Sequence, residues 1–160
     1  TSIFLKMNSL TDRQLIDALK EASQAGVKIK MIIRGICCIL PGIEGKTDNI
    51  EVISVVGRFL EHSRIFCFGT GENMKMYIAS ADWMTRNTEN RVEIAAPIYD
   101  QKIKNSIYDT LRIMWKDNLK ARILCSDGTY KKPEIKEGDE LIDCQNYLRH
   151  EYKVGRKIKL

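Results

Sequence analysis

At 160 residues and 44% hydrophobic composition, the chain is long enough for one substantial core and too short for two comfortable domains. Residues 1–160 are therefore expected to form a single domain. The formal net charge of +5, from 26 basic and 21 acidic residues, favours anionic ligands without selecting one. Since no segment approaches the roughly 20 apolar residues that span a bilayer, a membrane-spanning helix is excluded from the expected fold.

The beginning of the chain predicts two strands joined by a helix. Residues 2–7 (SIFLKM) have strand character, and Thr11 or Asp12 can cap the helix that follows. That helix is expected to end at Gly26, and its apolar residues recur at helical spacing: Leu15, Ile16, Leu19 and Ala22. Residues 27–34 (VKIKMIIR) predict the next strand. A strand, a helix and a strand in this order indicate parallel pairing with a right-handed crossover.

The rest of the chain predicts further strands and two more helices. Four segments have strand character: residues 51–56, 64–68, 75–80 and 92–98. The second and third are joined by GTGEN and predict a hairpin. A helix is expected over residues 100–117, with an apolar stripe of Ile103, Ile107, Leu111 and Met114 or Trp115. After residue 118 we expect a turn at SDG, a short strand, a loop and a helix over residues 139–152. The predicted fold is α/β, a mixed central sheet flanked by helices.

The five cysteines are Cys37, Cys38, Cys67, Cys125 and Cys144. They form no C-x-x-C pair, and an odd number is typical of a reducing compartment, so most are interpreted as packed thiols. The adjacent pair at 37 and 38 leaves a metal or redox role open, although neighbouring side chains diverge. No signal-like segment opens the sequence, so a cytoplasmic location is expected, with peripheral attachment to a membrane as an alternative. The strand-like start without methionine is expected of a piece of a longer protein.

Polar residues gather between positions 62 and 93. His62, one of two histidines, stands two residues before Arg64 at the start of an apolar strand. Because residues two apart on a strand share a face, these two are expected to project together, as are Ser80 and Asp82 on the neighbouring arm. Such a set suits a phosphoryl group, since arginine offers a planar fork of donors and histidine can give or take a proton. The alternative is an exposed histidine and arginine without function.

The order of these residues, from His62 to Glu93, resembles the HKD motif of the phospholipase D superfamily. That motif has a histidine, a lysine two residues later, and a downstream Gly-Ser-x-Asn segment that ends in an acidic residue. Here Arg64 takes the place of the lysine, Asp82 stands where asparagine is usual, Ala79 replaces the glycine, and the motif's own aspartate is missing. The resemblance therefore implies a phospholipase D-like fold but not lipid hydrolysis.

Longer strings resemble the C-terminal domain of bacterial polyphosphate kinases. They are KMNSLTD at 6–12, EASQAGVKIKMIIRGICCILPGI at 21–43, VVGRFLEHSRIF at 55–66, YIASADWMTRN with RVE at 77–93, and DCQNYLRHEY at 143–152. This resemblance implies reversible transfer of the γ-phosphoryl group of ATP to polyphosphate, through a phosphohistidine and with magnesium. By the same resemblance, the phosphorylated histidine belongs to a preceding domain, so this chain alone is expected to be inactive.

The resemblance also implies site residues. Arg34 and His62 match positions that contact the nucleotide phosphates, with His62 giving a proton or hydrogen bond to the leaving or bridging oxygen. The place of Arg34, at the end of a strand, agrees with this, because ligands gather beyond the carboxyl ends of strands in open α/β sheets. Arg64 and Arg91 are placed near the same tunnel. Three further candidates are Lys6, Ser80 and Asp82. For Lys6, the alternative is a solvated face of the first strand.

The implied partners are ATP or ADP, polyphosphate, upstream domains of the same polypeptide, and further copies of the full-length protein in a homo-oligomer. No carboxylate cluster has metal-ligand spacing, so no residue here is assigned to metal, and Mg²⁺ is expected to be held mainly by the substrate and the absent domain. Two other functions stay open. One is a phospholipase D-like phosphodiesterase or nuclease; the other is a polyanion-binding module that depends on salt and little on His62.

Overall fold

The computed structural model of the chain describes residues 1–153. Its strands are β1 (Ser2–Met7), β2 (Lys28–Ile33), β3 (Ile50–Val55), β4 (Arg64–Phe68), β5 (Lys75–Ala79), β6 (Ala95–Ile98), β7 (Ala121–Leu124) and β8 (Tyr130–Lys131). Its helices are α1 (Arg13–Gln24), α2 (Thr85–Asn90), α3 (Gln101–Trp115) and α4 (Cys144–Lys153), with a 3₁₀ turn over Gly71–Asn73.

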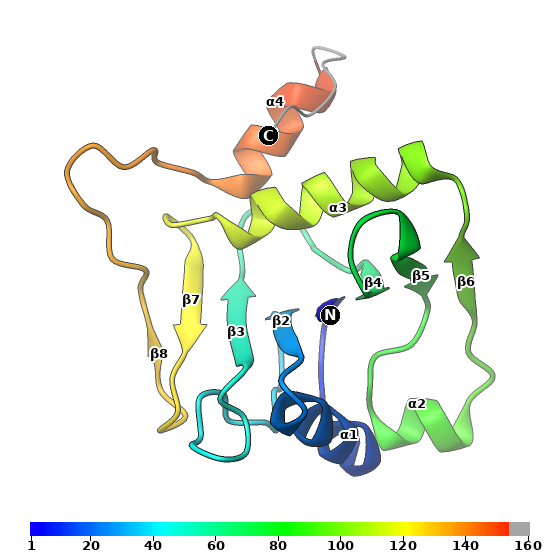
Figure 1. Ribbon diagram of the computed structural model, residues 1–160. Coiled ribbons are helices and arrows are strands. Elements are labelled where there is room, and N and C mark those ends of the chain that lie inside the picture. Colours follow the sequence, from blue (N-terminus) through cyan, green and yellow to red (C-terminus); the bar gives the residue numbers. More distant parts are fainter. Residues whose placement is uncertain (154–160) are drawn as a thin grey trace.

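All eight strands belong to one mixed sheet, in the order β6-β5-β4-β1-β2-β3-β7-β8 (Figure 1). The β1–β2 and β2–β3 pairs are parallel, and the remaining pairs are antiparallel. The predicted parallel strands around a helix and the predicted β4–β5 hairpin are both confirmed. The sheet therefore presents the carboxyl ends of three parallel strands at one edge.

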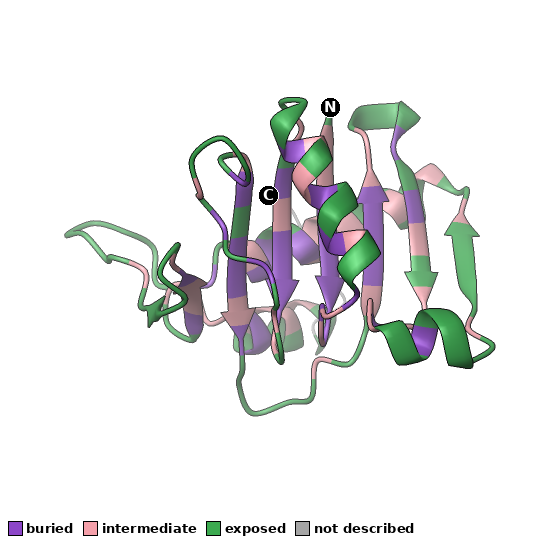
Figure 2. Ribbon diagram, turned by 90° about the horizontal axis from the view of Figure 1, so that it is seen from below, coloured by how far each residue is buried: buried purple, intermediate pink, exposed green. Residues whose placement is uncertain are grey.

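Helices cover both faces of this sheet. On β1, Phe4 faces the core beneath α3 while Leu5 faces the core beneath α1, as the alternation of a strand requires. Helix α1 contributes Ile16 and Leu19, and α3 contributes Leu111, Ile113 and Met114. Figure 2 shows buried residues concentrated in the central strands, while β6 at the outer edge is exposed. The fold is the predicted α/β sheet flanked by helices.

Local sequence accounts for the helix boundaries. Helix α1 begins after Asp12, whose Oδ1 accepts a hydrogen bond from the backbone N–H of Leu15 at 3.1 Å, so Asp12 rather than Thr11 is the cap. Asp100 caps α3 in the same way, through Ile103 N–H at 2.9 Å. The stripe predicted for α3 is wrong only at its first residue, since Ile103 is 52% exposed.

Several boundaries differ from the predictions. Helix α2 was not predicted because its sequence, TRNTEN, has no apolar residue to give a helical period, and its one buried residue is Asn87. Strand β6 begins at Ala95 rather than at position 92, and Val92 is 99% exposed. Helix α4 begins at Cys144 rather than at position 139.

The cysteines divide between the core and the surface. Cys67 and Cys144 are buried, Cys37 and Cys125 are half-buried, and Cys38 is exposed. Burial raises the pKa of the Cys67 thiol to about 12, which keeps it protonated and unreactive at neutral pH. Cys67 and Cys144 are therefore packed thiols, as predicted for most of the cysteines, and Cys38 is not among them. Within residues 1–153, no helix is both long and apolar enough to cross a membrane.

Candidate functional site

The candidate residues meet at the edge where β1 and β2 end. The register pairs Lys6 of β1 with Ile32 of β2 and, on the other side, with Ile65 of the antiparallel β4. Arg64, the first residue of β4, pairs with Ala79, the last residue of β5. The segments that follow β1, β2 and β5, and the one that precedes β4, therefore leave the sheet at one edge. Ligands commonly bind beyond this end of parallel strands.

Arg34 and His62 come together at this edge. Arg34 follows β2 directly and is half-buried; its Nε donates to Asn8 Oδ1 at 2.6 Å. Its Nη2 lies 3.4 Å from Nδ1 of the exposed His62. A guanidinium only donates, so a hydrogen bond at this contact has Nδ1 as its acceptor and requires the tautomer with its proton on Nε2. No residue among those described accepts a hydrogen bond from Nη1 of Arg34.

A second guanidinium supports this pair from inside the protein. Arg64 donates from Nε and Nη2 to the Asp82 carboxylate at 3.2 and 3.1 Å, and from Nη1 to the backbone carbonyl of His62 at 3.0 Å. Asp82 also accepts from the Asn8 backbone N–H at 2.7 Å and from its side-chain amide at 3.1 Å. Arg34, Asn8, Asp82, Arg64 and His62 thus form a closed ring of contacts.

The state of Asp82 follows from this ring. Burial opposes ionisation of the Asp82 carboxyl, but the hydrogen bonds from Arg64 and from the Asn8 backbone outweigh it and hold its pKa below the usual range. Asp82 is therefore a carboxylate at neutral pH, with both oxygens bonded to Arg64 and Asn8. It is a structural counter-ion and not a free base.

The expectation that His62 and Arg64 share a strand is wrong. Strand β4 begins at Arg64, and His62 lies in the preceding loop. The buried ammonium of Lys6 accounts for this, because it donates to the backbone carbonyl of Ser63 at 3.1 Å. In a longer strand, this carbonyl would instead accept a hydrogen bond from the backbone of a neighbouring strand. The two side chains consequently separate, with His62 turned to Arg34 and Arg64 to Asp82.

Lys6 is not on a solvated face. It is 2% exposed, and its Nζ donates to Ser63 Oγ at 2.8 Å and lies 3.7 Å from the Glu61 carboxylate. Burial lowers the pKa of the Lys6 ammonium, an effect that Glu61 opposes and the charge of Arg34 reinforces. The Lys6 ammonium therefore donates its hydrogen bonds to the loop that carries His62.

The structure does not bring Ser80 and Arg91 into the ring. The Ser80 hydroxyl donates to the Glu93 carboxylate and accepts from the Ile94 backbone N–H at 3.1 Å. Arg91 is exposed just after α2. Within residues 1–153, no hydrogen bond or ion pair joins Ser80 or Arg91 to His62. Ser80 therefore connects β5 to the start of β6, and Arg91 stays a prediction from resemblance.

Sequence reasoning missed Asn8, Glu61 and Ser63. Asn8 joins Arg34 to Asp82. The available signal was its position, one residue past the end of β1 at the same edge as Arg34. Glu61 and Ser63 flank His62, but their role depends on Lys6, 55 and 57 residues away in sequence. No local pattern predicts that contact.

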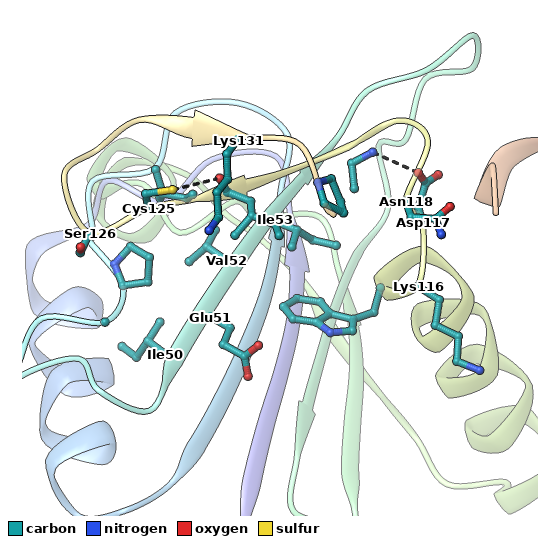
Figure 3. Close-up of a pocket in the computed structure, with 17 residues that line it drawn as sticks. Ile50, Glu51, Val52, Ile53, Lys116, Asp117, Asn118, Cys125, Ser126 and Lys131 are labelled. Carbon is teal, nitrogen blue, oxygen red and sulfur yellow. Dashed lines mark hydrogen bonds between the residues drawn. The ribbon is translucent and has the colours of Figure 1, made fainter. Parts of the chain in front are cut away.

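A cavity of about 480 Å³ lies elsewhere, beside β3, β7 and the end of α3 (Figure 3). Val52, Ile53 and Trp115 give it an apolar wall, and Glu51 and Lys131 add opposite charges. None of the seven residues proposed from the sequence lines it. The cavity is therefore separate from the candidate site.

The donors at the site do not fit a metal ion held by this chain. The Asp82 oxygens are bonded to Arg64 and Asn8, and those of Glu61 face Lys6 and Gln145. Among the described residues, no three His, Cys, Asp or Glu side chains are grouped so that they could hold a metal ion. Cationic groups predominate where the nucleotide is expected, which suits phosphate oxygens rather than Mg²⁺.

Comparison with known proteins shows the family of this chain. Residues 1–145 match the family described as "Polyphosphate kinase C-terminal domain 2". The chain belongs to this family. A polyphosphate kinase of Bacillus anthracis is 52% identical over 143 residues, which cover 89% of this chain and 20% of that protein. A polyphosphate kinase of Vibrio cholerae is 44% identical over 163 residues, which cover 99% of this chain and 23% of that protein.

This member of the polyphosphate kinase C-terminal family thus spans about a fifth of the length of such relatives. The crystal structure of polyphosphate kinase from Porphyromonas gingivalis superposes with a TM-score of 0.90 and 38% identity, over 96% of this chain and 24% of that one. The phospholipase D family member Nuc from Salmonella typhimurium gives a TM-score of 0.56 and 17% identity, over 83% of both chains. The second likeness concerns the fold alone, and it confirms the predicted phospholipase D-like architecture.

Proposed function

We propose that this chain supplies one half of the active site of a polyphosphate kinase. The reaction is reversible transfer of the γ-phosphoryl group of ATP to polyphosphate, through a phosphohistidine that another domain of the same polypeptide provides. The observation that carries the proposal is the contact between Arg34 and His62 at the carboxyl edge of the parallel strands, in a chain of this family. ATP, ADP and polyphosphate are the substrates and products.

The two side chains have distinct roles in this proposal. The Nη1 hydrogens of Arg34 bind phosphate oxygens, because Nε and Nη2 are directed at Asn8 and His62. The Nε2–H of His62 donates to the oxygen that bridges the β- and γ-phosphorus atoms. As the partner domain's histidine nitrogen bonds to the γ-phosphorus, that bridging P–O bond breaks and ADP leaves. In the second step a terminal oxygen of polyphosphate bonds to the same phosphorus, the P–N bond of the phosphohistidine breaks, and the free histidine is restored. Electrostatic stabilisation and positioning dominate such transfers.

The other candidates support this pair. Arg64 donates to the His62 backbone carbonyl and to Asp82. It therefore does not contact the phosphates directly, and its positive charge attracts them from a distance. Arg91 is proposed to bind phosphate at the rim of the tunnel. Magnesium would be bound by the nucleotide phosphates and by parts of the protein outside this chain. A cytoplasmic location and a homo-oligomer belong to the same proposal and rest on family resemblance.

The first prediction is that the 160-residue chain alone makes no acid-insoluble polyphosphate from ATP, while the complete polypeptide that carries it does. The physical reason is that transfer requires a positioned nucleophile. His62 faces Arg34 rather than a carboxylate, and His150, whose Nδ1 lies 3.6 Å from the Glu151 carboxylate, is exposed on α4 and has no hydrogen bond to the ring among the described residues. The measurement is incorporation of label from γ-labelled ATP, with release of nucleotides from a labelled oligonucleotide as a parallel assay. Synthesis by the chain alone contradicts the half-site, and nucleotide release without polyphosphate synthesis favours the phosphodiesterase alternative.

A further inference from the structure

The loop that carries His62 is held from two sides by side chains that the proposed chemistry does not use. It spans residues 56–63, between β3 and β4. One anchor is Lys6 in β1, and the other is Gln145, the second residue of α4. These polar side chains are 2% and 7% exposed. Buried polar groups need hydrogen-bond partners, and both anchors find them in this loop.

Lys6 holds the two residues that flank His62. Its ammonium donates to Ser63 Oγ at 2.8 Å and to the Ser63 carbonyl at 3.1 Å. It also reaches the Glu61 carbonyl at 3.5 Å and the Glu61 carboxylate at 3.7 Å. The residues before and after His62 are thus bound to one group on a buried central strand.

Gln145 holds the loop further upstream. Its carboxamide accepts from the Phe59 backbone N–H at 2.9 Å and donates to the Phe59 carbonyl at 2.7 Å. The same Nε2 lies 3.2 Å from the second oxygen of the Glu61 carboxylate. Glu61 therefore connects the two anchors, since one of its oxygens faces Lys6 and the other faces Gln145.

Two features hold the Gln145 anchor in place. The start of α4 is fixed by the buried Asp117, whose Oδ2 accepts from the Cys144 backbone N–H at 2.8 Å. On the loop side, a Cβ at Gly57 would lie 2.4 Å from Gln145 Oε1 and 2.9 Å from Cδ. Glycine at this position leaves the space that the carboxamide occupies.

We propose that Gln145 and Lys6 are positioning residues that fix the His62 imidazole through Phe59, Glu61 and Ser63. The proposal rests on the proposed function, because the position of His62 matters for transfer only if His62 acts on phosphate. Neither anchor touches the nucleotide. Their effect is to keep the imidazole within reach of the bridging oxygen, where a displacement of 1 Å can lower the rate about 100-fold.

The test uses the complete polypeptide with Gln145→Leu, with Gly57→Ala, and with these two substitutions combined. Amide exchange in residues 56–63 is expected to become at least about tenfold faster in each single variant. The kcat for polyphosphate synthesis should fall about 10- to 100-fold, while KM for ATP changes less than about threefold. Gly57→Ala acts by displacing the carboxamide, so the double variant should be no slower than the slower single variant.

Asn146→Ala is the matched control, since Asn146 is the next residue of α4, is exposed, and within residues 1–153 its side chain has a hydrogen bond only with Asp143. It should leave both exchange and kcat within about twofold, as surface substitutions usually do. Unchanged exchange in Gln145→Leu overturns the anchoring, and faster exchange with unchanged kcat overturns the positioning role. If the unsubstituted polypeptide makes no polyphosphate, the proposed function fails, while the exchange measurement still decides whether Gln145 anchors the loop.

Discussion

Replacing His62 by alanine in the complete polypeptide is expected to lower ATP-dependent polyphosphate synthesis by about 10²- to 10⁴-fold, the range that a positioned general acid or base contributes. Arg34→Ala should lower it at least as far, because arginines that stabilise charge in phosphoryl transfer contribute about 10³- to 10⁵-fold. Arg34→Lys should restore little, since lysine has no planar fork to bind Asn8, His62 and a phosphate together. The measurement is the initial rate of label incorporation at saturating ATP.

The chain offers matched controls. Arg149 and His150 are exposed on α4 and, among the described residues, neither has a hydrogen bond or ion pair with the ring. Arg149→Ala and His150→Ala therefore remove the same two kinds of side chain outside the ring. Both should keep synthesis within about twofold of the unsubstituted rate. Because Arg34 and His62 are in contact, the double variant should lose less than the product of the two single losses. If His62→Ala leaves the rate unchanged, the loop that carries His62 has only a structural role. If the affinity for ATP is unchanged in both His62→Ala and Arg34→Ala, the result favours a plain polyanion-binding surface.

How much of this site is readable from sequence depends on whether its contacts are local. Arg34 could be placed at the ligand-binding edge because VKIKMIIR is an apolar β-branched run that ends at a glycine. Helix α1 could be placed for the same reason, since its cap and its apolar period lie within residues 12–24. The hairpin of β4 and β5 likewise follows from two apolar runs around a glycine-bearing turn.

The position of His62 could not be predicted from the local sequence, because it depends on Lys6, which is 56 residues away. The residue pattern of RIFCF extends naturally to His62 by strand alternation, but the ammonium of Lys6 captures the loop carbonyls and the strand starts at Arg64. A lysine on a first strand is usually solvated, so nothing local indicates that this one is buried. The same limit applies to Gln145, whose partners in the loop are 84 and 86 residues earlier.

The close approach of two backbone segments at the site, those after β1 and β2, could not be predicted from the sequence either. A Cβ at Gly35 would lie 2.8 Å from the carbonyl oxygen of Asn8, to which the Gly35 N–H donates at 2.8 Å. Glycine therefore lets the segment after β2 approach the segment after β1, and this brings Arg34 within reach of the Asn8 side chain. The sequence shows the glycine, but only the fold shows what it approaches.

Asp82→Ala is expected to lower the free energy of unfolding of the chain by about 3–5 kcal/mol, the usual cost of removing one partner from a buried ion pair. The substitution leaves the Arg64 guanidinium, in a side chain that is 14% exposed, without the carboxylate that binds two of its nitrogens. It also leaves the Asn8 backbone N–H without its acceptor. Urea denaturation followed by circular dichroism measures the change. Asp48→Ala, at an exposed aspartate, is the control and should change the free energy by less than about 0.5 kcal/mol.

The same carboxylate predicts the direction of the pH dependence. The pKa of Asp82 is lower in the folded chain than its usual value of about 3.9, so its stabilisation is present above that value and is lost as pH falls through the folded pKa. Asp82→Asn should therefore be less stable than the unsubstituted chain at pH 7, and the difference should shrink on acidification below about pH 4. A difference that stays constant down to pH 2 would show that Asp82 acts through packing rather than charge.

Removing both Asp82 and Arg64 separates two effects of the ring: its contribution to stability and its role in holding Arg34 in place. Asp82→Ala combined with Arg64→Leu should recover part of the stability lost in Asp82→Ala, because no buried charge is left without a partner. Polyphosphate synthesis by the complete polypeptide should not recover with it. The double variant still lacks the acceptor that orients Asn8, and Asn8 in turn holds Nε of Arg34. Recovery of both stability and synthesis would mean that the ring only stabilises the fold, and that Arg34 and His62 are positioned correctly without it.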